Sequence, residues 1–163
     1  MHPKCAIRSG HDPVDPLDEP EYYCIDIPGF RENVQLDAPL MAHTLKRFGS
    51  ADEMWVMNYP AEGQIYAPEY ERCIEVESAT SGAKIRLKKP SDSPLQRFEL
   101  TDKGTLVLKA HPELGFAVAV GEGTKAGGRS HLRRDMNLKK LSETDKKLSA
   151  WKLVTSADTW PEN

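Results

Sequence analysis

Short apolar and β-branched runs, broken by glycine and proline at roughly ten-residue intervals, dominate this chain. The apolar positions show little sustained repeat at the 3.6-residue period of an α-helix, and short runs of this kind are typical of a β-sandwich or barrel. The pattern predicts strands at Tyr22–Ile27, Trp55–Asn58, Gln64–Ala67, Arg72–Glu77, Lys84–Leu87, Arg97–Leu100, Thr105–Leu108, Phe116–Val120 and Trp151–Val154. Between Ala38 and Phe48 the composition favours a short helix or a long loop, and Gly121–Ser130 is predicted to be a mobile loop.

Three fragments of the chain superimpose as internal repeats. Each consists of a strand led by an aromatic residue, a polar turn with glycine, a second strand, a short loop and a third strand. The leading aromatics are Trp55, Phe98 and Trp151, which are separated by 43 and 53 residues. The third repeat is complete only if Cys5–Ser9 pairs with Trp151–Val154, and that pairing would also remove the exposed edges of the sheet.

These repeats resemble the β-trefoil fold and, within it, the ricin B-type lectin family. The family's repeat strand is matched by Cys24-Ile25-Asp26-Ile27, by Cys73-Ile74-Glu75-Val76 and, more weakly, by Ala117-Val118-Ala119-Val120. Its Gln-x-Trp element appears in altered form as Glu53-Met54-Trp55, Gln96-Arg97-Phe98 and Ser149-Ala150-Trp151. The resemblance implies an all-β chain that forms a single β-trefoil domain over residues 1–163. Its three four-stranded repeats, related by pseudo-threefold symmetry, would span approximately 1–58, 59–100 and 101–163, with the aromatics filling the core.

The resemblance also implies a sugar site in the first repeat. In this family, an acidic residue two places after the strand cysteine bonds to sugar hydroxyls, and amide residues assist it. Asp26 matches the acidic position, Gln35 matches the next polar position, and Asp52 stands where the family often has asparagine. The residues alone leave another interpretation open, in which Asp26 is a solvent-facing residue of an alternating strand.

This first-repeat site departs from the family in its platform and its charge. Asp37 stands where the stacking aromatic is expected, so His43 or Phe48 would have to supply the apolar face. Asp52 beside Asp26 and Asp37 makes the site acidic, which suits a cation or an amine better than a neutral sugar, or raises the pKa of a carboxyl group.

The other two repeats are weaker candidates for sugar binding. Glu75 holds the acidic position of the second repeat, with Arg86 and Gln96 at the polar positions, and a cross-strand ion pair between Glu75 and Arg86 is expected. Ala119 stands at the acidic position of the third repeat, which therefore lacks the acceptor.

Residues 121–147 are rich in lysine and arginine. A loop that presents Arg129, Arg133 and Arg134 would bind sulfate or phosphate, as in β-trefoils that bind sulfated glycans, and the alternative is a solvated insertion in a mobile loop. No aromatic residues interleave these charges, so binding of single-stranded nucleic acid by base stacking is not expected.

Composition narrows the function classes. The net charge of −3 argues against a surface that binds nucleic acid as a whole. The chain has no apolar run near the roughly 20 residues of a membrane helix and no apolar signal segment at its start, so a cytoplasmic protein is expected, with non-classical export left open. Cys5, Cys24 and Cys73 form no CxxC pair and are expected to be buried free thiols.

No catalytic, phosphate-binding or metal-ligating motif is found, so no enzyme activity, metal or other cofactor is expected. The sequence predicts a carbohydrate-binding module with at most one or two sugar sites, the first repeat being favoured, and a glycan or glycoprotein as partner. The alternative is a trefoil that contacts another protein through exposed loops, including a protease inhibitor, or one that binds a sulfated glycan.

Overall fold

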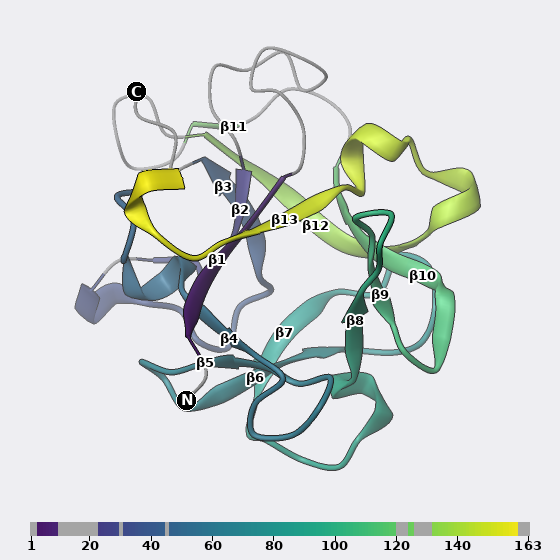
Figure 1. Ribbon diagram of the computed structural model, residues 1–163, viewed down its shortest axis with the longest axis horizontal. Helices are drawn as coiled ribbons and strands as arrows, with labels where there is room; N and C mark the ends of the chain where they lie inside the picture. The colour runs from purple at the N-terminus through teal and green to yellow at the C-terminus, as the bar shows by residue number, and fades with distance from the viewer. Residues whose placement is uncertain are drawn as a thin grey trace.

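A computed structural model of the chain describes residues 3–9, 23–29, 31–44, 46–119, 124–125 and 132–159. Strands, turns and single-turn 3-10 helices make up this part of the protein (Figure 1). The strands are β1 (Lys4–Ser9), β2 (Tyr23–Asp26), β3 (Met41–Thr44), β4 (Trp55–Met57), β5 (Ile65–Ala67), β6 (Arg72–Val76), β7 (Ile85–Lys88), β8 (Phe98–Leu100), β9 (Leu106–Leu108), β10 (His111–Val118), β11 (Thr124–Lys125), β12 (Leu132–Lys140) and β13 (Trp151–Val154). The 3-10 helices are η1 (Arg31–Asn33), η2 (Ala51–Glu53), η3 (Pro94–Gln96), η4 (Leu141–Glu143), η5 (Lys146–Leu148) and η6 (Ala157–Thr159). Within the described ranges no helix is long and apolar enough to cross a membrane.

The strands form three units that repeat one arrangement. The first unit holds β1 to β4, the second β5 to β8, and the third β9, β10, β12 and β13. In the first unit, β1 pairs with β4. In the second, the amide of Phe98 donates to the carbonyl of Gly63 at 2.8 Å, and in the third the amide of Trp151 donates to the carbonyl of Gly104 at 2.7 Å. In each unit the last strand is therefore hydrogen-bonded to the segment at the start of the same unit.

Pairing between successive units closes the units into a ring. Strand β4 pairs with β5, and β8 pairs with β9. The ring closes where β13 pairs antiparallel with β1, with Leu153 opposite Ile7 (Figure 1, yellow beside purple). The barrel therefore joins segments that lie far apart in the sequence, and this pairing covers an edge of β1 that would otherwise be open.

The three leading aromatics fill the core, as predicted. Trp55, Phe98 and Trp151 are each at most 3% exposed. The indole of Trp55 donates to the carbonyl of Ile25 at 3.2 Å, and the indole of Trp151 donates to the carbonyl of Phe116 at 3.0 Å. Phe98 meets the Phe116 ring edge to face, with centroids 5.1 Å apart.

These indole bonds correct the predicted register of the third repeat. They place Phe116 where the first unit has Ile25, so Ala117 and not Ala119 lies at the position of Asp26. The sequence Phe-Ala-Val-Ala-Val alternates in steps of two and fits either register equally well, and only the core contacts distinguish them. The third unit has no carboxylate at this position in either register.

The segment from Ala38 to Phe48 is neither a helix nor only a loop, contrary to the prediction. Its centre forms β3, which pairs with β2 on one side and β12 on the other. Hydrogen bonding on both edges outweighs a local composition that would also suit a helix.

Strand β12 was not predicted, because its apolar alternation is interrupted. Arg134, Met136 and Leu138 point inward and are buried, and an arginine at one of these inward positions hides the pattern. Residues 132–140 of the basic stretch therefore form a strand within the sheet rather than a loop.

Candidate functional site

Asp26, the predicted sugar ligand of the first repeat, lies inside the protein. Its side chain is fully buried, and its carboxylate accepts a hydrogen bond from Lys46 Nζ at 2.8 Å. The same ammonium contacts the carboxylate of Asp52, which is 6% exposed. Residues 46–54 cover the end of β2, where the Ile27 amide donates to the Asp52 carbonyl at 3.1 Å. The alternative interpretation, in which Asp26 faces solvent, is therefore wrong.

Glu53 and His43 complete this buried cluster. Glu53 is 2% exposed, and its Oε1 accepts a hydrogen bond from the backbone amide of Lys46 at 3.0 Å. His43 Nδ1 lies 3.8 Å from Glu53 Oε2 and 2.7 Å from the carbonyl of Thr44. The sequence placed Glu53 at the Gln-x-Trp position but carried no sign of Lys46, which reaches Asp26 from 20 residues away.

Burial shifts the pKa values of the ionisable groups in this cluster. Burial raises the pKa of Asp26 to about 7 against the opposing pull of Lys46, and burial also raises the pKa of Glu53 well above its usual range. Burial lowers the pKa of Lys46, but attraction to Asp26 and the other carboxylates outweighs it, so the net pKa is raised. One ammonium faces three carboxyl groups, and burial disfavours ionisation of both Asp26 and Glu53.

The same buried cluster contains three groups that could hold a metal ion. Asp26, His43 and Glu53 each offer a ligand atom, and these atoms lie within 4.8 Å of one another. The Lys46 ammonium, however, already supplies positive charge to Asp26, and His43 Nδ1, which faces Glu53, donates to a carbonyl, so only Nε2 of that ring keeps a lone pair. The arrangement is that of an internal ion-pair cluster.

We expect the stability of the protein to fall as the pH rises from about 4 to about 7. Asp26 titrates near pH 4 in the unfolded chain but near 7 in the folded protein, so the folded state binds more protons across this window. The contribution is fully present below about pH 4 and lost through pH 7, on the order of 4 kcal/mol for the shift of Asp26. Urea unfolding from pH 4.5 to 8 should show this loss in the wild type relative to Asp26→Asn. Parallel pH profiles for the two proteins would contradict it.

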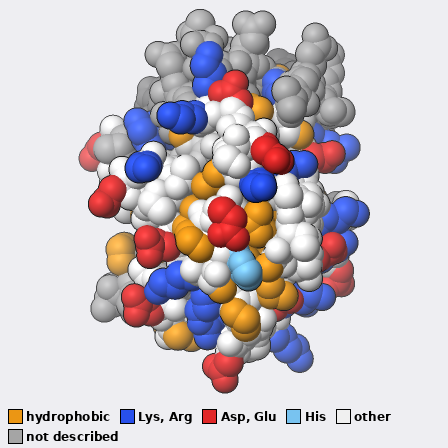
Figure 2. All heavy atoms as spheres, turned by 90° about the vertical axis from the view of Figure 1, so that its right-hand side faces the viewer, with side chains coloured by type: hydrophobic (Ala, Val, Ile, Leu, Met, Phe, Trp, Pro, Cys, Tyr) orange, Lys and Arg blue, Asp and Glu red, His pale blue; other side chains and the backbone are white. Residues whose placement is uncertain are grey.

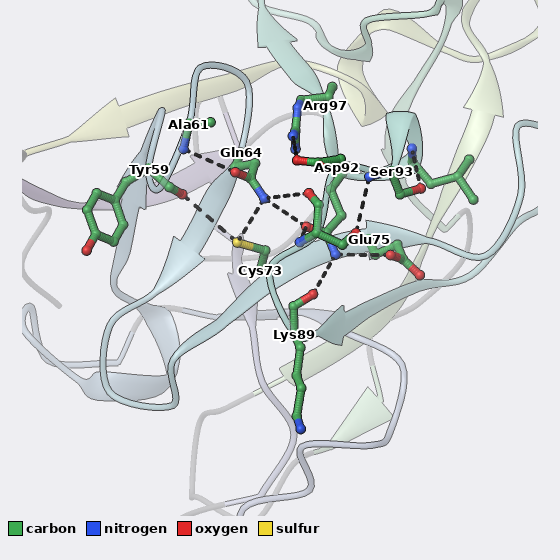
Figure 3. Close-up of polar contacts among 12 residues, drawn as sticks. Tyr59, Ala61, Gln64, Cys73, Glu75, Lys89, Asp92, Ser93 and Arg97 are labelled. Atoms are coloured by element: carbon green, nitrogen blue, oxygen red, sulfur yellow. Dashed lines mark hydrogen bonds and ion pairs between the residues drawn. The ribbon is translucent and has the colours of Figure 1, made fainter.

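The second unit fixes its equivalent loop with a network centred on the side-chain amide of Gln96 (Figure 3). Gln96 is fully buried, and its amide nitrogen donates to Glu75 at 3.0 Å and to the carbonyl of Lys89 at 2.9 Å. Its oxygen accepts from Gln64 at 2.9 Å and from the amide of Ser91 at 3.0 Å. Gln96 and Glu53 thus play one role in their units, because the side-chain oxygen of each accepts a backbone N–H from the loop before it.

The expected ion pair between Glu75 and Arg86 is not formed, and that prediction is wrong. The two residues are opposite one another in the sheet, but the Arg86 guanidinium contacts Glu77 and donates to the carbonyl of Asp37 at 2.8 Å. The exposed carboxylate of Asp37 accepts from Arg72 at 3.2 Å. Asp37 therefore lies against the second unit, apart from the Asp26 cluster.

An open cavity of about 520 Å³ lies between the β2–β3 connection and β12. It brings together Gln35, predicted for the sugar site, with Arg133 and Arg134, predicted for an anion site. Arg129 lies outside the described residues. The lining is completed by Pro28, Ala38, Pro39, Leu40, Met41, Lys84, Ala119, Asp135, Met136 and Asn137.

The two arginines point to opposite faces of β12. Arg134 is 8% exposed, donates to the carbonyl of Ala119 at 3.0 Å and lies over the Tyr23 ring at 5.7 Å. Arg133 is exposed on the outer face. The two do not act as a pair on one mobile loop, because alternation along a strand separates them.

The outer face of β12 supplies the polar wall of the cavity. Asp135 and Asn137 alternate with inward residues, as Arg133 does, and Asp135 lies opposite Met41 of β3. Lys84 forms a bridge with Asn137, whose side chain donates to the carbonyl of Gly82 at 3.2 Å. No local pattern in the sequence identifies Asp135, Asn137 and Lys84, because only the fold brings them beside Gln35.

The arrangement of three four-stranded units in a closed ring is shared with solved structures of low sequence identity. A designed 3-fold symmetric protein, ThreeFoil, superimposes with a TM-score of 0.66 over 93% of this chain and 97% of its own, at 16% identity. The β-trefoil lectin of the Vibrio vulnificus hemolysin/cytolysin superimposes with a TM-score of 0.59 over 95% of this chain and 96% of its own, at 14% identity. The fold is a β-trefoil.

A third similar structure is the agglutinin from Abrus precatorius, with a TM-score of 0.64 and 15% identity over 94% of this chain. The trefoil spans about half of that agglutinin chain, 48% of its length. No protein-family model matches the chain, and no curated protein matches it in sequence. The predicted likeness to ricin B-type lectins is confirmed at the level of the fold.

Neither proposed stacking platform faces the cavity of the trefoil. His43 is 5% exposed and belongs to the buried cluster. Phe48 packs against the small cluster of Ala6, Met54 and Val154. Met41 and Pro39 supply the apolar part of the cavity instead.

A second cavity of about 590 Å³ lies between the β8–β9 turn and residues 141–149 of the trefoil. Its lining mixes both signs of charge, with Glu99 and Asp102 beside Lys103 and Lys146. Figure 2 shows the same mixture across the face that carries β9 and β10, where acidic and basic side chains alternate with apolar ones. Neither sign of charge therefore dominates the lining of this cavity.

Proposed function

We propose that this trefoil is a non-enzymatic, lectin-like protein that binds a saccharide in the cavity between β3 and β12. The observation that carries the proposal is the lining, in which an amide, a carboxylate and a second amide (Gln35, Asp135 and Asn137) surround an apolar floor at Met41 and Pro39. The two amides and the carboxylate can form hydrogen bonds with vicinal hydroxyls of a sugar. The apolar floor can pack against the C–H face of the sugar ring.

The fold and the size of the cavity support this assignment. Two of the similar structures are an agglutinin and a lectin with N-acetyl-D-lactosamine bound. A volume of about 520 Å³ suits a small saccharide. Because the floor has no aromatic ring, each site is expected to bind weakly, and avidity would come from several sites presented together.

In this proposal Asp135 takes over the acceptor role expected of Asp26. The Asp26 carboxylate is shielded from solvent and bonded to Lys46. Asp135 is exposed and lies in the row of β2, β3 and β12 residues that contains Asp26, with Met41 between the two. The proposed acceptor, Asp135, therefore lies on the same face of the sheet as Asp26 but two strands away from it.

Asp135→Asn is expected to weaken saccharide binding by at least about tenfold, or 1.4 kcal/mol, because an amide accepts fewer hydroxyl bonds than a carboxylate. Gln35→Ala should weaken it as well. The melting temperature should stay unchanged in both variants, since both side chains are exposed. The measurement is a glycan array followed by titration calorimetry, with Asp158→Asn as a matched surface control. Full binding by both variants would place the ligand elsewhere, and an array without any bound glycan would refute the proposal.

A further inference from the structure

We propose that the cavity selects saccharides that carry a negative charge, a carboxylate or a sulfate on the ring, and that Arg133 anchors this charge. This inference rests on the proposed function and names the class of its ligand. It follows from the sign, the placement and the pairing of the charges around the cavity.

The sign of the cavity opposes the sign of the protein. The chain as a whole has a net charge of −3. The cavity lining contains Lys84, Arg133 and Arg134 against a single carboxylate, Asp135. A concave surface with one sign of charge concentrates the potential at its floor, which attracts anionic ligands.

The cations stand at the two ends of the polar wall. Along β12, Arg133, Asp135 and Asn137 share one face, so Arg133 and Asn137 are about 13 Å apart at strand spacing. The backbone of Lys84 forms an isolated antiparallel β-bridge with that of Asn137. Lys84 therefore lies at the Asn137 end of the polar wall, away from Arg133. A ring seated at Asp135 would reach one cation with a charged substituent and would leave the other for a neighbouring residue of the glycan.

Arg133 and Lys84 are also not committed to internal partners. Across the described surface other cations form ion pairs, including Arg72 with Asp37, Lys109 with Glu62 and Arg97 with Asp92. Within the same described residues, neither Arg133 nor Lys84 forms one. Each can therefore bind an external anion without first breaking an ion pair.

Arg133 is better suited to anchor the charge than its neighbour. Arg134 is turned inward, bonded to the Ala119 carbonyl and placed over the Tyr23 ring, so it adds positive charge beneath the cavity without reaching the ligand. The exposed guanidinium of Arg133 can donate two parallel hydrogen bonds to a carboxylate or a sulfate. Asp135 then remains for ring hydroxyls.

The test uses matched saccharides that differ only in charge. Neutral N-acetyllactosamine is compared with its 6-O-sulfated form and with its sialylated form at low and at physiological salt, after an array that pairs neutral and acidic glycans. We expect at least a tenfold preference for an acidic member, which shrinks as salt rises. The two acidic forms separate sulfate from carboxylate as the preferred group. Arg133→Gln should abolish the preference while neutral binding remains, and Lys152→Gln, an exposed cation outside the lining, should change nothing.

Three results would overturn the inference, and they are distinguishable. Equal binding of neutral and acidic members would refute the charge preference and leave the proposed saccharide function standing. A preference that survives Arg133→Gln would refute the assignment of Arg133 as the anchor of the charge. Failure of every glycan, neutral or acidic, to bind would refute the proposed function itself.

Discussion

Lys46→Met is expected to lower the free energy of unfolding by about 3–5 kcal/mol, the cost of removing one partner from a buried ion pair. Lys46 supplies the ammonium at 2.8 Å from Asp26 and in contact with Asp52, and both carboxylates are almost entirely buried. Methionine keeps the length and the packing of the side chain but leaves these carboxylates without a counter-charge. The measurement is equilibrium urea unfolding at pH 7.

The control for this prediction is a second substitution that removes the charge of Asp26. Asp26→Asn in the Lys46→Met background should recover part of the lost stability, because it removes one unpaired charge. Lys152→Met, an exposed lysine of β13, should cost less than about 0.5 kcal/mol. A loss below about 1 kcal/mol for Lys46→Met would show that water reaches the cluster and screens its charges.

Trp151→Ala should destabilise the protein by about 3–5 kcal/mol. The indole is 2% exposed, and its nitrogen donates to the carbonyl of Phe116, so the substitution creates a cavity and leaves a buried acceptor unpaired. The residue also begins β13, the strand that closes the barrel against β1. The loss should appear as a lower urea midpoint with little change in the slope of the transition.

Leu153→Ala provides the matched control on the same strand. Leu153 is 39% exposed, so its truncation removes less buried surface and should cost about 1 kcal/mol or less. Equal losses for the two variants would contradict the view that the inward aromatic holds the barrel together.

The fold could be predicted because the barrel imposes the same demand three times. Each unit needs one large aromatic residue in the core and an apolar strand beside it. Trp55, Phe98 and Trp151 fill this position in the three units, and their repetition can be recognised in the sequence. Strands β3 and β12 escaped prediction for the opposite reason. Their pairing partners, and not their own apolar patterns, hold them in the sheet.

The site was predicted only in fragments, because its chemistry depends on contacts that no local pattern records. Asp26 matches a sugar-binding position by motif, but Lys46 reaches it from another loop and neutralises it. Gln35 and Arg133 were assigned to different ligands, and only the pairing of β3 with β12 makes them neighbours. Spacing along the chain identifies candidate residue types, whereas burial and cross-strand pairing decide which of them meet a ligand.

The pairing of β1 with β13 has a consequence for the order of folding. Residues 4–9 leave the ribosome well before their partners, residues 151–154, which emerge only after the strands between them. The first two units can form local hairpins during synthesis, but β1 must wait with one edge unsatisfied until the last strand arrives. Such distant pairing raises the contact order and slows folding. The newly made chain therefore passes through a stage in which an apolar strand edge is open to other chains, and this is the stage at which a chaperone would protect it.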